Sequence, residues 1–205
     1  MFELLTGTGL AASAGLNAYI PLLTIGVLAR YTGLITLPDG WQWLSNGWVL
    51  VILAALLAVE LVADKVPVVD HVNDVVQTVV RPTAGGLAFG AGSASETVTV
   101  SDPGGFFSSD QWIPVVVGVL IALGVHAVKA TLRPIINTTT GGLGAPVAST
   151  AEDATSVIVS VAAILLPVLV LVFLAVLVIG GPWLIGRARR RRRERKAARA
   201  AGYRV

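Results

Sequence analysis

Long uncharged stretches alternate with polar segments along this chain. About 20 apolar residues cross the ~30 Å hydrocarbon core of a bilayer as a helix. Four stretches approach or exceed this length: residues 9–29, 46–63 (uncharged apart from Glu60), 112 to about 127, and 154–186. No soluble fold needs four such segments in 205 residues. The pattern therefore predicts an all-α integral membrane protein with about four full transmembrane helices.

Composition supports this class and excludes several others. Hydrophobic residues make up 55% of the chain and charged residues 13%, which excludes a disordered chain and argues against an ordinary soluble domain. The absence of cysteine excludes disulfides, thiolate metal sites and a cysteine nucleophile. With only two histidines, a structural zinc site is not expected either. We expect no metal and no cofactor.

The net charge of +3 is distributed unevenly. Ten of the 15 basic residues follow Gly186, so residues 1–186 carry a net charge of −6. Basic residues next to a span are retained in the cytoplasm. We therefore expect one multi-span domain, 1–186, in a bacterial inner membrane, and a cytoplasmic tail, 187–205. Four spans would place the N-terminus in the cytoplasm too, and the chain start lacks the basic region of a cleaved signal peptide.

The basic tail can have either of two roles. It can simply fix the orientation of the last span, or it can bind anionic lipid headgroups, at about 1 kcal/mol per basic residue close to the surface. No aromatic residue interrupts the arginines before Tyr203, so nucleic acid is not an expected partner.

Two polar segments resemble each other after a shift of 52 residues. Arg81-Pro82 aligns with Arg133-Pro134, and after a gap Gly85-Gly86-Leu87 aligns with Gly141-Gly142-Leu143. Proline ends or kinks a helix, and paired glycines allow a turn or close packing. The pattern predicts two broken, re-entrant segments in a possible inverted repeat with halves 46–92 and 112–148, a layout typical of transporters. The alternative is two amphipathic helices lying at the membrane interface.

Charged residues in these segments share helix faces. Glu60 and Asp64 are four apart. Asp70, Asp74 and Arg81 lie close to one stripe, and His126, Lys129 and Arg133 form another. Aligned by the repeat, an acidic stripe faces a basic one. Ionisable groups at membrane depth are costly unless paired, and they mark functional pathways. A purely structural ion-pair cluster is the alternative.

Several of these motifs together resemble a family of small bacterial membrane proteins that carries only a domain-of-unknown-function label. The resemblance rests on Gly-Leu-Asn-Ala-Tyr19-Ile-Pro21, Asp70-His71-x-x-Asp74, Arg81-Pro82, His126-x-x-Lys129-x-x-x-Arg133, Asn137-Thr138 and Glu152-Asp153. It covers roughly residues 8–185, and it implies a compact multi-span fold without an established activity. Where the family is expected to have an acidic, proline-containing stretch after Asn-Thr, this chain has Thr139-Thr140-Gly141-Gly142.

The residues favour a small transporter of an anionic or lipid-phosphate substrate, with proton coupling as one option. The expected substrate-binding residues are Arg81, Arg133, Lys129 and Asn137. The expected proton or ion pathway comprises Glu60, Asp64, Asp70, Asp74, His71 and His126, and the expected backbone turns are Gly85, Gly86, Gly141 and Gly142. With so few spans, a homo-oligomer is expected.

Two other functions remain open. Asp70, His71 and Asp74 could bind a divalent cation, although adjacent residues on a helix point about 100° apart. A non-catalytic scaffold with a lipid-binding tail is the other alternative. An enzyme is not expected, because the hydrolase, metalloprotease and phosphate-loop motifs are all missing.

Overall fold

The computed structural model describes residues 2–65, 67–93, 112–141 and 143–180, together with the single positions 183, 186, 187, 190 and 194. All regular secondary structure in these residues is helical. The α-helices are α1 (Phe2–Leu16), α2 (Tyr19–Tyr31), α3 (Gly47–Ala63), α4 (Pro67–Ser93), α5 (Trp112–Thr140), α6 (Gly144–Leu165) and α7 (Leu169–Ala175). A 3-10 helix, η1 (Asp39–Ser45), precedes α3, and a π-helical turn, η2 (Val176–Gly180), follows α7. The predicted all-α class is confirmed.

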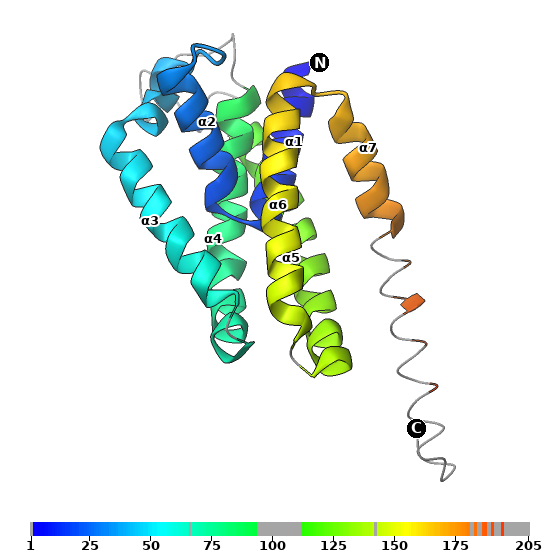
Figure 1. Cartoon of the computed structure of the whole chain (residues 1–205). Helices are drawn as coiled ribbons and strands as arrows, with labels where there is room; N and C mark the ends of the chain where they lie inside the picture. Colours follow the sequence, from blue (N-terminus) through cyan, green and yellow to red (C-terminus); the bar gives the residue numbers. More distant parts are fainter. Residues whose placement is uncertain are drawn as a thin grey trace.

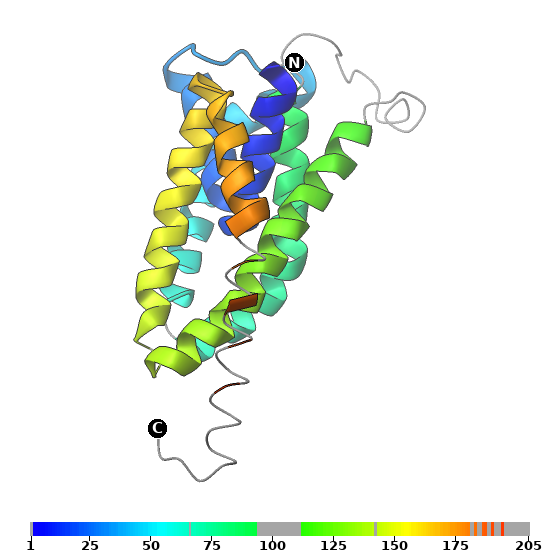
Figure 2. The same cartoon turned by 90° about the vertical axis from the view of Figure 1, so that its right-hand side faces the viewer.

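Four long helices surround a short hairpin. Helices α3 to α6 run antiparallel along the bundle, whereas α1 and α2 enter from one end and turn back near its middle (Figures 1 and 2). The hairpin arms have 15 and 13 residues, compared with 27 in α4 and 29 in α5. Helix α1 packs against α4, α5 and α6. The hairpin therefore fills one half of the bundle, and the other half contains α3 to α6 alone.

The break between α1 and α2 lies inside the first expected span. Asn17 Oδ1 accepts hydrogen bonds from the backbone N–H groups of Tyr19 (3.1 Å) and Ile20 (3.3 Å) at the start of α2. Pro21 follows within the first turn, where a missing N–H costs no helical hydrogen bond. The expected uninterrupted span over 9–29 is therefore wrong, because an asparagine side chain stabilises a new helix start in the middle of the apolar stretch.

The last expected span is also interrupted. Helix α6 ends at Leu165, and Leu166 adopts φ −140° and ψ 66°, outside the helical region. Pro167 follows, and proline disfavours a helical conformation in the residue before it. Helix α7 then runs back in the opposite direction (Figure 1). The stretch 154–186 is expected from its length to tilt or to bend at Pro167; the interruption does lie there, but the expectation of a single span is wrong because the chain reverses its direction.

The fold is nevertheless that of a membrane protein. Helices α5 and α6 are long and apolar enough to cross a bilayer, and η1 with α3, bent by 59°, is a third candidate. Large apolar side chains face outward along these helices, such as Val59 (66% exposed) and Ile158 (67% exposed), while Arg81 is fully buried. This distribution is the reverse of that in a soluble protein. The described residues thus contain two or three candidate spans, and the predicted count of about four is not confirmed.

The two Arg-Pro segments are not broken. Helix α4 continues through Pro82, and α5 continues through Pro134. Proline and glycine are tolerated in membrane helices where neighbouring helices support the backbone, and α4 packs extensively against both α1 and α5. The expected helix breaks at the two arginines are therefore wrong. Whether the segments 46–92 and 112–148 are an inverted repeat stays a prediction.

The glycines expected to form turns have different roles. Gly85 and Gly86 lie within α4, where an added Cβ would collide with Ala122, Val119 and Val115 of α5, so they permit close helix packing and form no turn. Gly141 has φ +63° and forms the turn that follows α5, as expected. Gly142 lies outside the described residues.

Candidate functional site

Charged side chains from four consecutive helices meet inside the half of the bundle that the α1–α2 hairpin leaves unfilled. We call these residues the buried ionic cluster: Glu60, Asp64, Asp74, Arg81, His126, Lys129, Arg133, Glu152 and Asp153. Helical spacings of three, four and seven place the members from α4 and from α5 each on one inward face. Six members are buried, and Asp74, Glu152 and Asp153 are partly exposed, with 13–19% of the side chain accessible. The buried charges depend on partners within the protein.

Arg81 lies at the centre of one half of the cluster. Its Nη2 donates to Glu60 Oε1 at 2.9 Å and lies 3.6 Å from Asp64 Oδ2, while Nη1 lies 3.7 Å from Asp74 Oδ1. Arg81 is 0% exposed and Glu60 is 2% exposed. The guanidinium is thus surrounded by carboxylates from α3, from the residue that caps α3 and from α4.

His126 completes this half of the cluster. Its Nδ1 lies 3.0 Å from Arg81 Nη1, and its Nε2 lies 3.1 Å from Thr78 Oγ1. Arginine can only donate, so Nδ1 must accept, and the neutral ring carries its hydrogen on Nε2. Thr78 Oγ1 donates its own hydrogen to Asp74 O. The imidazole is therefore held in one tautomer between a cation and a hydroxyl.

Lys129 and Arg133 form the second half of the cluster. Lys129 Nζ lies 3.2 Å from Asp64 Oδ2 and 3.1 Å from Glu152 Oε2. Arg133 Nη2 donates to Glu152 Oε2 at 2.8 Å, and Arg133 Nη1 donates to Ala145 O at 3.1 Å. Asp64 joins the two halves, because its Oδ2 also lies 3.5 Å from Arg133 and 3.6 Å from Arg81.

The turn of the α1–α2 hairpin contacts the same cluster. Asn17 Nδ2 donates to Asp153 Oδ1 at 3.0 Å, and Lys129 Nζ donates to Leu16 O at 3.2 Å. The carbonyl of Leu16 is available because α1 ends there. The helix break and the charged residues are therefore parts of one site.

A group of buried hydroxyls continues from this turn along the α1–α6 contact. Ser13 Oγ lies 2.7 Å from both Ser156 Oγ and Ser160 Oγ, and all three side chains are fully buried. Farther along α1, Thr6 Oγ1 donates to Ala163 O at 2.8 Å. Polar contacts thus follow α1 from its hairpin turn toward its N-terminal end.

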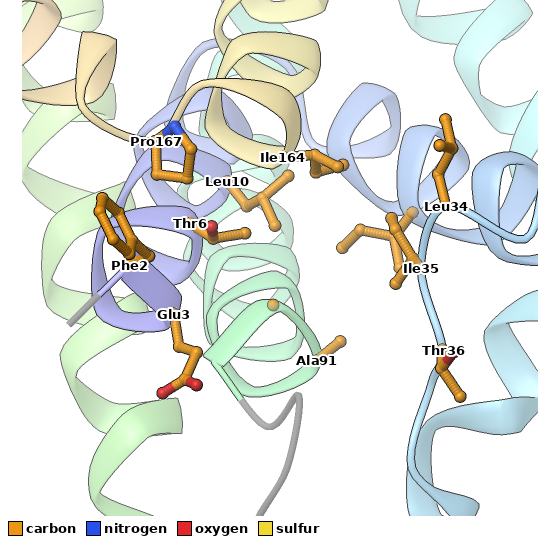
Figure 3. A pocket seen from close by; sticks show the side chains of 12 residues that line it. Phe2, Glu3, Thr6, Leu10, Leu34, Ile35, Thr36, Ala91, Ile164 and Pro167 are labelled. Atoms are coloured by element: carbon orange, nitrogen blue, oxygen red, sulfur yellow. The ribbon is translucent and has the colours of Figure 1, made fainter.

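A cavity of about 340 Å³ lies at that end of the bundle. Figure 3 shows Thr6, Leu10, Ile164 and Pro167 around it, with Phe2 and Glu3 of α1 and Leu34 to Thr36 of the loop after α2 nearby. The hydroxyl group of Ser13, Ser156 and Ser160 lies between this cavity and the ionic cluster along α1. These buried hydroxyls and the cavity thus lie along the same helix as the hairpin turn that contacts the cluster.

Several buried polar atoms of the region have no hydrogen-bond partner among the described residues. They are Glu60 Oε2, Asp74 Oδ1, Gln77 Oε1, Arg81 Nε, Asn137 Oδ1, Ser149 Oγ and Asp153 Oδ2. A structural ion-pair cluster gains stability only when its lone pairs and protons are satisfied. These atoms therefore have hydrogen-bonding capacity that no described residue satisfies.

Most of the residues predicted from the sequence come together here. The exceptions are Asn137, which makes no hydrogen bond or ion pair with a described member of the cluster, and Asp70 and His71, which lie on α4 but whose side chains are outside the described structure. Among the described residues, no group of three or more carboxylate and imidazole side chains has the geometry of a metal site.

Glu152, Asp153 and Asn17 belong to the site but were not predicted as site residues. Glu152 and Asp153 are an acidic pair directly before a long apolar stretch, which is a signal in the sequence for a charge at membrane depth. Asn17 gives a weaker signal, as one polar amide in an apolar stretch.

Comparison with known proteins identifies a family and no activity. A family model described as a domain of unknown function (DUF4126) matches residues 4–187. No curated protein and no solved structure matches the chain. The matched region begins within α1 and includes helices α2 to α7 and the whole ionic cluster, so the chain belongs to this family of unknown function.

Proposed function

We propose that this protein is a membrane transporter that moves a small anionic solute together with protons, with the buried ionic cluster as its binding site. One observation carries the proposal: two buried arginines, Arg81 and Arg133, are neutralised by carboxylates that belong to other helices or turns. Arginine binds carboxylates and phosphates through the same forked donors. An anionic solute would therefore compete with Glu60 and Glu152 for the same guanidinium groups.

Protonation would decide this competition. When Glu60 takes up a proton, it loses its negative charge, and the attraction that holds Arg81 at 2.9 Å largely disappears. The cluster then carries one negative charge fewer, although Asp64 and Asp74 still lie 3.6 and 3.7 Å from Arg81, and an anion that enters beside Arg81 restores this charge. One proton enters for each negative charge delivered, so the net charge of the buried site is preserved. Because an uncompensated buried charge is costly, proton and anion move together.

The unpartnered atoms of the cluster fit this mechanism. Glu60 Oε2 and Asp153 Oδ2 are buried and make no hydrogen bond to a described residue, so each offers a proton a position that no existing hydrogen bond occupies. Arg81 Nε is an unused donor. His126 is held neutral beside Arg81 and offers a further proton-accepting position once its contact with Arg81 changes.

The hairpin and the hydroxyl group support access from one side. Asn17 and Leu16 at the hairpin turn contact Asp153 and Lys129 of the cluster. A change in the charge of these partners would alter the contacts that hold the hairpin. We propose that the α1–α2 hairpin separates the cluster from the cavity near Thr6 and moves during transport.

Membrane orientation follows from the tail within the same proposal. If the ten basic residues after Gly186 hold the tail in the cytoplasm, the end of the bundle at which α1 and α7 start faces the opposite side. This proposal places the N-terminus outside the cytoplasm and so differs from the expectation that four spans would put both termini inside. We place the protein in the bacterial inner membrane, as an oligomer whose subunit number the chain does not define.

A flux experiment tests the proposal. The purified chain is reconstituted into vesicles with a trapped pH indicator, and an inward gradient of inorganic phosphate or of short-chain phosphatidic acid is imposed. We expect at least one of these anions to acidify the vesicle lumen. Glu60→Gln should abolish the coupled proton movement, and Arg81→Lys should weaken it strongly, because lysine lacks the forked donors.

Arg30→Lys is the matched control, since Arg30 lies outside the cluster and donates to Ser45 O on the exposed surface. It should leave the proton flux unchanged. The proposal is refuted if neither anion moves protons, or if Arg81→Lys and Arg30→Lys behave alike. A response only to phosphatidic acid would identify the substrate as a lipid phosphate.

A further inference from the structure

The ammonium group of Lys129 is held by oxygen atoms from three separate parts of the fold. Its Nζ lies 3.2 Å from Leu16 O at the end of α1, 3.2 Å from Asp64 Oδ2 after α3, and 3.1 Å from Glu152 Oε2 on α6. The Lys129 side chain is 1% exposed. A primary ammonium group has three hydrogens to donate, so these three oxygens can satisfy all of them.

The same three oxygens form a set that binds metal cations of low charge. Carboxylates and backbone carbonyls are hard ligands, suited to cations that do not prefer nitrogen or sulfur. The Leu16 carbonyl lies at the C-terminal end of α1, where the helix dipole favours a positive charge. Broken helices in transporters place free carbonyls near the membrane midplane in the same manner.

We infer that Lys129 occupies a monovalent-cation site and that its ammonium group replaces the ion. The charges of the neighbouring side chains decide whether a monovalent or a divalent ion fits the site. Arg133 Nη2 lies 2.8 Å from Glu152 and 3.5 Å from Asp64, so it already neutralises part of the two carboxylates and would repel a divalent ion. Loss of the Lys129 charge leaves the site short of one positive charge, which one sodium or potassium ion restores.

This assignment has a consequence for coupling that rests on the proposed function. A site filled permanently by a covalently attached cation does not need sodium or potassium. The transporter is then driven by protons, and Lys129 holds the hairpin turn in the position where an ion-dependent carrier would need a bound ion.

The test removes the covalently attached ammonium group of Lys129 and asks whether a free metal ion takes its place. Lys129→Met removes the charge and shortens the side chain by one atom, leaving room for an ion beside the three oxygens. The full-length variant in detergent micelles is unfolded by heating in sodium chloride, potassium chloride or choline chloride at equal ionic strength. Lys65→Met is the matched control, because the Lys65 side chain is 41% exposed and its Nζ lies 3.9 Å from Asp153 Oδ2, without a contact to the three oxygens around Lys129.

We expect Lys129→Met to unfold at a lower temperature than the wild type in choline chloride. Sodium or potassium at about ten times the dissociation constant should then raise its Tm by about 3–6 °C relative to choline. The wild type and Lys65→Met should show no such difference. Adding Asp64→Asn to Lys129→Met should remove the effect of the metal ion.

Two outcomes would overturn the assignment: an equal Tm of Lys129→Met in choline, sodium and potassium, or the same ion-specific shift in the wild type. If Lys129→Met cannot be purified folded, Lys129→Gln takes its place, since the amide still donates to Leu16 O and leaves the charge missing. Because the readout is unfolding, the result is separate from the flux experiment. An ion-specific shift without any proton flux would support the cation site and refute the transport proposal.

Discussion

The pair of Glu60 and Arg81 gives the most specific prediction about stability. Glu60 has one cation within 4 Å among the described residues, Arg81 at 2.9 Å, whereas Asp64 contacts Arg81, Lys129 and Arg133. Replacing Arg81 therefore leaves Glu60 without a counterion in a site that is 2% exposed. Removing one partner of a buried ion pair costs about 3–5 kcal/mol of unfolding free energy. We expect Arg81→Met to cost this amount.

Glu60→Gln should cost less than Arg81→Met. Arg81 retains Asp64 at 3.6 Å and Asp74 at 3.7 Å, so its charge stays compensated. At an effective dielectric constant of about 20, each of these contacts still provides roughly 4–5 kcal/mol of attraction before desolvation. The glutamine side chain also keeps the shape of Glu60. We expect a loss of about 1–2 kcal/mol, close to the value of a hydrogen bond to a charged group.

The double variant Glu60→Met with Arg81→Met completes the test. Replacing both members of a buried pair with apolar residues is often neutral, so the double variant should be at least about 2 kcal/mol more stable than Arg81→Met alone. The assay is equilibrium unfolding of the purified chain in mixed micelles, followed by tryptophan fluorescence. A loss below about 1 kcal/mol for Arg81→Met would refute the argument. An equal loss for Glu60→Gln would refute it as well.

Three further predictions concern the hairpin, the helix packing and the membrane. Asn17→Ala removes both the hydrogen bonds to the start of α2 and the contact with Asp153. It should lower the unfolding free energy by about 1–2 kcal/mol in the same assay. An unchanged value would exclude a stabilising role for the hairpin turn. Gly118→Leu forces a side chain against the backbone of Gly85 and should prevent folding. Gly124→Leu, at a position with open space, should not. Equal yields of folded protein from the two variants would contradict the observed α4–α5 contact. Because the chain has no cysteine, the single variants Thr36→Cys and Leu143→Cys can each be labelled in intact and in opened vesicles. We expect the two cysteines to react from opposite sides of the membrane. Reaction of both from the same side would contradict the course of α3 to α6 across the membrane.

Much of the site could be predicted without the fold. An arginine, a lysine or a carboxylate inside an apolar segment needs a partner, so Glu60, Arg81 and Lys129 could be identified as functional candidates from their position alone. Helical spacing also predicted which of them share a face. The partners were not predictable in the same way, because Glu152 and Arg133 come from two helices whose contact depends on how the whole bundle packs.

The prediction of helix breaks shows the limit of local rules. Pro82 lies inside a helix that continues, whereas Asn17 lies where an apolar stretch is interrupted. Proline is a strong local signal, but α4 has neighbours on two sides that support its backbone. Asparagine is a weak local signal, yet its amide satisfies two N–H groups and reaches Asp153. The contacts that support α4 come from residues far away in the chain, whereas Asn17 combines two local hydrogen bonds with one distant contact to Asp153.

The amino-acid sequence by itself determined the class of this protein. The length of its apolar stretches and the few charges within them require a helical membrane protein, because backbone polar groups in lipid must be satisfied within a helix. Tertiary structure alone decided that the first apolar stretch is a hairpin and that the charges form one connected cluster. The physical reason is that a buried charge is stable only beside its counterion, and packing of the helices determines which counterion that is.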